Sequence, residues 1–204
     1  MPFYMPQPGE YVKDIDLKGD LGYGSHRFRR IRKRNDFMDY IPFMQSALIE
    51  ARQALDRGEF PVGCVISNAG EILVSGCRAN SRPETRNELD HAEMVALRRL
   101  VDLGPEIDPN NLCVFTTLEP CLMCYSALIL NGIKTIIYAY EDTFGGGTTI
   151  DLKPLRPFYR HLNIKVVSGV LREKSRTLFR DFFSNPDNSY LRQSPLARQV
   201  LREP

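Results

Sequence analysis

Two short motifs, H-x-E and, further along the chain, P-C-x-x-C, constrain this protein more than any other part of its sequence. One imidazole and two thiolates are ligands that zinc prefers, and a catalytic zinc with three protein ligands keeps its fourth position open for water. A carboxylate beside such a site can take a proton from the water and pass it to a leaving amine. We therefore expect the fold to bring His91, Cys121 and Cys124 together as metal ligands, with Glu93 beside them as the acid–base group.

The spacing within each motif predicts its place on the fold. Pro120 suits the first position of a helix, where its missing N–H costs nothing, and the two cysteines then lie on one helical face. The histidine and glutamate of the first motif would diverge inside a helix and can converge only at a helix N-terminus. Apolar patterns follow both motifs, over Met94–Leu103 and Leu122–Leu130. Two helix N-termini should therefore point at the metal, where their partial positive charge favours thiolates.

Simpler interpretations of each motif exist. Asp90 and Glu93 also fit a capping box, in which the glutamate only satisfies backbone donors. A lone C-x-x-C can be a redox pair. A zinc-stabilised binding module without catalysis would need a fourth protein ligand, for which Cys64, Cys77 and Cys113 are available. The joint occurrence of both motifs favours the catalytic site, because a closed structural site has no use for Glu93.

Composition sets the broad class and the compartment. The chain is 43% hydrophobic and 25% charged, which is ordinary for a soluble globular enzyme, and its net charge of +2 does not by itself imply nucleic acid. No stretch approaches the length of a membrane span, and the first residues carry no apolar signal core, so neither a membrane partner nor export is indicated. Five cysteines, two of them assigned to metal, argue for a reducing cytoplasm rather than a disulfide framework.

Apolar periodicity predicts the remaining elements. A helix should begin near Phe37, with Pro42 in its first turn or at its true start. Gly145-Gly146-Gly147 is expected to be a flexible connection rather than a phosphate cradle, because no P-loop pattern surrounds it. The polar crossover at 151–161 is long enough to make the last two strands parallel. The other predicted elements are a hairpin of 61–66 and 71–76, strands at 112–117, 135–140 and 164–170, and a helix at 172–183.

Together the two motifs have the form of the signature of zinc nucleobase deaminases. The chain resembles the cytidine deaminase-like zinc hydrolases, and most closely the bacterial tRNA-specific adenosine deaminases. The resemblance covers Phe37 to Phe183, the bulk of the chain. Residues 117–124 resemble that family's cysteine motif, the separation of His91 and Cys121 is similar to its spacing, and 181–183 look like its C-terminal helix.

This resemblance implies a fold and a set of site residues. The fold would be α/β, a three-layer cytidine deaminase-like fold with a five-stranded mixed sheet between helices. Zinc would be the cofactor, and two copies would form a homodimer. Residues 60–63 are similar to the family's first strand and Asn80 matches an asparagine that contacts the base, so Asn80, Pro61 and Val62 are implied as substrate-binding residues. Glu88-Leu89-Asp90 departs from the Pro-Thr-Ala that the tRNA enzymes usually carry.

The implied activity is hydrolytic removal of an exocyclic amino group from a nucleobase, a reaction at the C–N bond of a cyclic amidine. Adenosine in tRNA, converted to inosine, is the closest match. Guanine, cytosine and nucleoside deaminases share the zinc motifs, so a free base, nucleoside or nucleotide is the alternative.

The chain would then consist of three parts. They are an N-terminal arm at 1–35, the zinc-dependent deaminase domain at 36–183 and a C-terminal tail at 184–204. The arm holds a basic run at 26–34, which is a candidate for phosphate contact, although a solvated arm or packing on a partner subunit fits it equally.

Overall fold

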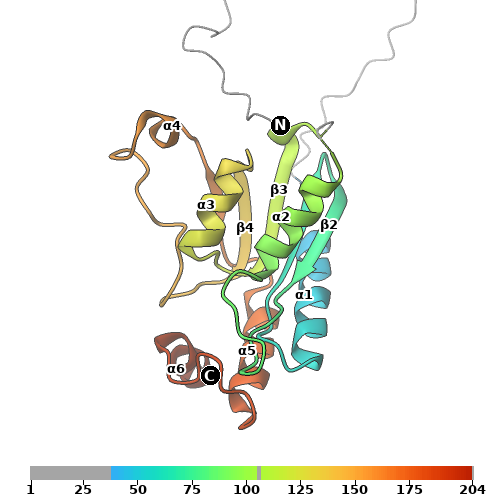
Figure 1. Ribbon diagram of the computed structural model, residues 1–204, viewed down its shortest axis with the longest axis vertical. Coiled ribbons are helices and arrows are strands. Elements are labelled where there is room, and N and C mark those ends of the chain that lie inside the picture. Colours follow the sequence, from blue (N-terminus) through green and yellow to red (C-terminus); the bar gives the residue numbers. More distant parts are fainter. Residues whose placement is uncertain (1–37, 105–106, 204) are drawn as a thin grey trace, which may run out of the picture. The chain divides into compact units, whose positions relative to one another are not determined.

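A mixed five-stranded sheet organises the part of the chain that the computed structural model describes, residues 38–104 and 107–203 (Figure 1). Its order is β2-β1-β3-β4-β5. The strands are β1 (Gly63–Asn68), β2 (Glu71–Cys77), β3 (Leu112–Leu118), β4 (Thr135–Tyr140) and β5 (Lys165–Val167). β1 is antiparallel to both β2 and β3, whereas β3, β4 and β5 run parallel. The expected hairpin and the mixed sheet are confirmed. The predicted arm at 1–35, with its basic run, lies outside the described residues.

Helices cover both faces of this sheet (Figure 1). On one face, α1 (Ile41–Asp56) packs Met44 against Val65 of β1 and Phe115 of β3. On the other face lie α2 (Ala92–Asp102) and α3 (Leu122–Leu130). Because the paired positions on adjacent strands share a face, the buried residues separate into two clusters, one under α1 and the other under α2 and α3. This is the predicted three-layer arrangement.

Three further helices complete the described part of the chain, besides the short 3₁₀ turn η1 (Pro109–Asn111). They are α4 (Pro157–Arg160), α5 (Arg172–Ser184) and α6 (Pro195–Arg202). α5 contacts α1 and β4 and buries Phe179 against Tyr140. Among the helices of the described ranges, none is long and apolar enough to cross a membrane.

α2 lies very close to β2, and a glycine makes this possible. A Cβ atom on Gly76 would lie 2.6 Å from the carbonyl oxygen of Ala92 and 2.7 Å from the backbone nitrogen of Ala96. The side chains of both alanines are fully buried. This contact between backbones sets where the N-terminus of α2 lies, and therefore where His91 is presented.

The segment after residue 184 is packed, although the sequence predicts a tail there. Leu196, Ala197 and Val200 of α6 are buried in the same core cluster as the phenylalanines of α5. The Ser194 hydroxyl caps α6 by accepting a hydrogen bond from the Ala197 backbone N–H at 3.1 Å. α6 has eight residues, of which three are buried, and so short an apolar pattern does not reveal a helix by its periodicity.

Candidate metal centre

The three predicted metal ligands meet at the N-termini of two helices. His91 is the N-cap of α2, Cys121 is the N-cap of α3, and Cys124 lies one turn further along α3. The Nδ1 atom of His91 lies 3.5 Å from the Cys121 Sγ and 3.4 Å from the Cys124 Sγ. A tetrahedral zinc with ordinary Zn–N and Zn–S distances separates such atoms by about 3.5 Å, so the donor set fits one zinc ion.

The simpler interpretations of the motifs do not describe this site. Cys64, Cys77 and Cys113 are not members of the cluster of possible ligands. The capping box does not form, because the N-cap of α2 is His91 rather than Asp90. The Asp90 carboxylate instead accepts hydrogen bonds from the side chains of Asn80, Asn87 and Arg98. Pro120 precedes the N-cap of α3, which corrects its predicted place at the first helical position.

Glu93 lies in the first turn of α2 and is 3% exposed. Its Oε1 accepts a hydrogen bond from the Thr116 hydroxyl of β3 at 3.0 Å. Burial raises the pKa of Glu93 above its ordinary value, while the charge of His91 and the Thr116 hydrogen bond act in the opposite sense. A carboxyl group with a raised pKa suits proton transfer near neutral pH, because it both takes and returns a proton readily.

The pKa values of the two thiols in the cluster are shifted in opposite directions. A hydrogen bond from Cys124 lowers the pKa of Cys121 to about 4. The same hydrogen bond, together with burial, raises the pKa of Cys124. Zinc is held by thiolates, so metal loading would release the proton that Cys124 holds.

A pocket adjoins the cluster and includes Glu93, His91 and Cys121 in its lining. Of the three residues that the sequence implies as substrate-binding, Val62 lines this pocket, whereas Asn80 and Pro61 are not among its lining residues. The Asn80 amide donates to the Asp90 carboxylate at 2.7 Å. Roles of these three residues in binding a base stay predictions.

Several lining residues were not identified from the sequence. Glu119 and Asp142 follow β3 and β4, and the signal available for them was their place at the carboxyl ends of neighbouring parallel strands. Tyr190 and Leu191 come from the segment between α5 and α6, far from both motifs in sequence. The other lining residues that the sequence did not indicate are Phe60, Arg78, Ala92 and Leu118.

The glycine-rich segment after β4 is packed against the metal site, and its predicted flexibility is wrong. Gly146 forms a β-bridge with Cys121, and the Gly147 backbone N–H donates to the Pro120 carbonyl at 2.8 Å. A Cβ atom on Gly147 would lie 2.6 Å from the Leu122 Cα. Gly147 is therefore needed for close approach to the start of α3, and a Cβ atom on Gly146 would lie 2.5 Å from the Glu119 carboxylate.

The buried Glu93 beside three possible metal ligands, on helices that cover a mixed sheet, has the arrangement of the zinc-dependent nucleobase deaminases. A family model described as the cytidine and deoxycytidylate deaminase zinc-binding region matches residues 39–140. The chain belongs to this family, and it is accordingly a hydrolytic nucleobase deaminase with zinc as its cofactor.

Similarity to individual proteins extends over most of the domain. A tRNA-specific adenosine deaminase of Rickettsia felis is 33% identical over 142 residues, which are 69% of this chain and 97% of the relative. The tRNA-specific adenosine deaminase 2 of Danio rerio is 32% identical over 170 residues, which are 76% of this chain and 78% of the relative.

Solved structures agree with the fold. A tRNA:A34 deaminase, studied for A-to-I editing at the wobble position of transfer RNA, superimposes with a TM-score of 0.57 and 30% identity. The match covers 67% of this chain and 98% of that structure. A bifunctional diaminohydroxyphosphoribosylaminopyrimidine deaminase and reductase from Thermotoga maritima shares the fold, with a TM-score of 0.55 and 24% identity, over 78% of this chain and 42% of that one.

Proposed function

We propose that this deaminase acts on adenosine in tRNA and converts it to inosine. The main support is its similarity to tRNA-specific adenosine deaminases along almost their whole length. The nucleotides of an RNA loop are already partly unstacked, so moving one into a pocket beside the metal centre requires little additional free energy.

In this proposal His91, Cys121 and Cys124 hold the zinc, and Glu93 moves protons. When bound, zinc supplies a Lewis acid that lowers the pKa of water. Glu93 takes a proton from the attacking water and delivers it to the ring nitrogen of adenine. It then transfers the second water proton to the amino group, which leaves as ammonia, while the water oxygen remains on the base. Glu93 is protonated and deprotonated in turn and ends as it began.

A second surface hollow supports an RNA substrate. It shares Leu191 with the catalytic pocket and is also lined by Phe144 and Arg192. The Phe144 side chain is 56% exposed, and an exposed aromatic ring beside a catalytic pocket can stack on a neighbouring base. Arg198 and Arg202 are exposed on α6 and can contact phosphates. The arginines of the N-terminal basic run, to which we assign the same role, lie outside the described residues.

A free base, nucleoside or nucleotide of the guanine or cytosine type is the second candidate substrate. The observation that favours it is that Tyr190 and Leu191 form one wall of the catalytic pocket. A wall at that place can exclude a polymer while admitting a small molecule.

The substrate is tested by turnover at one salt concentration. We expect ammonia release and inosine formation with a tRNA that carries adenosine in its anticodon loop, and much slower turnover of free adenosine, guanine, cytosine and their nucleosides. Binding of the tRNA should weaken steeply as salt rises, because phosphate contacts release counterions. Efficient turnover of a free base, with none on the tRNA, would overturn the substrate and leave the deaminase chemistry intact.

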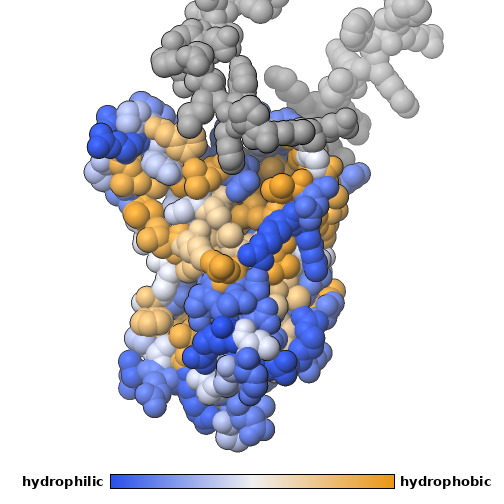
Figure 2. Space-filling model, in the orientation of Figure 1, coloured by the Kyte–Doolittle hydropathy of each residue, from blue (hydrophilic) through white to orange (hydrophobic). Residues whose placement is uncertain are grey.

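We also propose that two copies form a homodimer and act in the cytoplasm. α3 leaves Leu122 and Leu130 more than half exposed. Figure 2 shows apolar side chains gathered on the face of the molecule that carries this helix. Such a patch suits the apolar centre of an interface. The five free cysteines fit a reducing compartment.

The dimer is tested by light scattering of the protein at micromolar concentration. We expect a dimer, and we expect Leu130→Glu to shift it to monomer because a carboxylate would be buried in the interface. Ile49→Glu is the matched control, since Ile49 is similarly exposed on α1, across the sheet. A wild-type protein that is monomeric throughout this range would contradict the proposal.

A further inference from the structure

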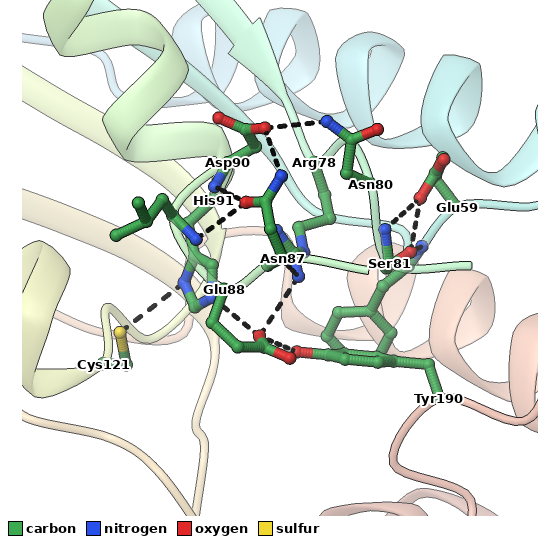
Figure 3. Close-up of polar contacts among 12 residues, drawn as sticks. Glu59, Arg78, Asn80, Ser81, Asn87, Glu88, Asp90, His91, Cys121 and Tyr190 are labelled. Carbon is green, nitrogen blue, oxygen red and sulfur yellow. Dashed lines mark hydrogen bonds and ion pairs between the residues drawn. The ribbon is translucent and has the colours of Figure 1, made fainter. Parts of the chain in front are cut away.

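The carboxylate of Glu88 lies where three side chains meet beside the metal centre (Figure 3). Its Oε2 atom accepts a hydrogen bond from the Tyr190 hydroxyl at 2.7 Å and one from Arg78 Nη2 at 3.1 Å. The same oxygen lies 3.6 Å from the Nε2 atom of His91. One carboxylate therefore connects the metal-ligand histidine to a residue that lines the catalytic pocket.

His91 presents its two ring nitrogens to different partners. Nδ1 faces the two sulfur atoms, so it is the nitrogen placed to bind metal. A neutral imidazole that binds metal through Nδ1 carries its proton on Nε2. Nε2 is buried and has no hydrogen-bond partner within the described ranges. A buried donor needs an acceptor, and the Glu88 carboxylate lies just beyond hydrogen-bond distance.

We infer that Glu88 is a positioning residue for His91, and that Tyr190 and Arg78 hold Glu88 in place for this role. The inference rests on the proposed metal centre. A carboxylate that accepts the second N–H of a ligating histidine fixes the orientation and tautomer of the ring and raises its basicity. The segment after α5 would in this way support the metal site as well as line the pocket.

The packing around Arg78 and Tyr190 holds these two residues in place, whereas Glu88 by itself is exposed. The side chain of Glu88 is 58% exposed, and an exposed glutamate ordinarily samples several rotamers. Arg78 is 2% exposed, and its guanidinium carbon lies 5.5 Å from the centre of the Tyr190 ring. The Tyr190 ring in turn lies 5.2 Å from that of Phe60. Two anchored partners therefore restrict a carboxylate that would otherwise move freely.

The test measures zinc release from the full-length, zinc-loaded protein to an excess of a chromogenic chelator. Substituting the partner of a ligating histidine typically costs about 10–100-fold in metal affinity, so we expect Glu88→Ala to accelerate release by that order. Glu88→Gln keeps an acceptor oxygen and should restore most of the retention. Tyr190→Phe keeps the ring against Phe60 but removes the hydroxyl, and should accelerate release less than Glu88→Ala.

A double variant shows whether Tyr190 acts through Glu88. If it does, Glu88→Ala with Tyr190→Phe releases zinc no faster than Glu88→Ala alone. Glu84→Ala is the matched control, because Glu84 is an exposed glutamate of the same loop and should leave zinc release unchanged. If Glu88 had a merely structural role, Glu88→Ala would lower the unfolding temperature, but the effect of Tyr190→Phe on zinc release would not depend on Glu88.

The inference is overturned if folded Glu88→Ala releases zinc within about twofold of the wild-type rate, or if Tyr190→Phe adds to it independently. Should Glu88→Ala fail to fold, Glu88→Gln and Tyr190→Phe decide the question instead. The inference expects Glu88→Gln to retain zinc better than Tyr190→Phe, and equal zinc release from the two would overturn it. The readout contains no substrate, so a wrong tRNA assignment leaves it unaffected. A wild-type protein that binds no zinc would refute the metal centre itself.

Discussion

Replacing Glu93 with alanine should abolish deamination while leaving zinc and the fold in place. Glu93 is not one of the clustered possible ligands, and its carboxylate accepts a hydrogen bond from the Thr116 hydroxyl. General acid–base groups contribute about 10²–10⁴-fold to rate, and a group that moves a proton in several steps can exceed this. Ammonia release and zinc content, measured on the same preparation, test both parts of the expectation.

Glu93→Gln is the control for packing. It keeps the volume of the side chain and an oxygen that can accept the Thr116 hydroxyl, but it cannot accept and return a proton. We expect it to be as inactive as Glu93→Ala and to unfold at a temperature closer to wild type. Turnover near the wild-type rate in either variant would show that another group carries the proton.

Removing any one of His91, Cys121 and Cys124 should eliminate bound zinc. Three protein ligands leave no redundancy, so zinc content measured by metal analysis should fall from about one ion per chain toward zero in each alanine variant. Deamination should be lost with the metal. The unfolding temperature of the wild-type protein should also fall when a chelator removes the zinc, because an ion that binds only the folded state stabilises that state.

The other cysteines are the controls for this experiment. Cys64 is buried in β1, Cys77 ends β2, and Cys113 lies near the start of β3, at the opposite end of that strand from the metal centre. Their alanine variants should keep zinc. A folded Cys113→Ala protein without zinc would point instead to a closed structural site.

Local chemistry explains which parts of the site could be predicted from the sequence. The possible metal ligands lie within two short motifs, and each motif places its own side chains at a helix N-terminus, although tertiary packing decides where the two helices meet. The apolar pattern likewise predicts α3 with its observed bounds. By contrast, Tyr190 reaches the pocket through the packing of α5 and α6, and no pattern near Tyr190 records that contact.

Other differences arise where local and tertiary effects compete. Glycines 145–147 fit a flexible turn by propensity, but Gly146 packs closely on Glu119 and Gly147 on the start of α3. β5 is shorter than its apolar run and ends at Val167, shortly before Gly169, whose backbone adopts a φ of 82°. A residue with positive φ interrupts an extended strand, and this could not be foreseen from hydrophobicity.

The backbone contact at Gly76 limits how this enzyme can diverge during evolution. A side chain at that position would meet backbone atoms of Ala92 and Ala96, so no smaller neighbouring side chain could relieve the clash. α2 would have to move, and His91 and Glu93 would move with it. New substrate preferences must therefore arise at pocket positions such as Leu191 and Asp142, whose side chains can change without moving α2. Descendants that act on quite different substrates would still keep Gly76, although this residue does not line the catalytic pocket.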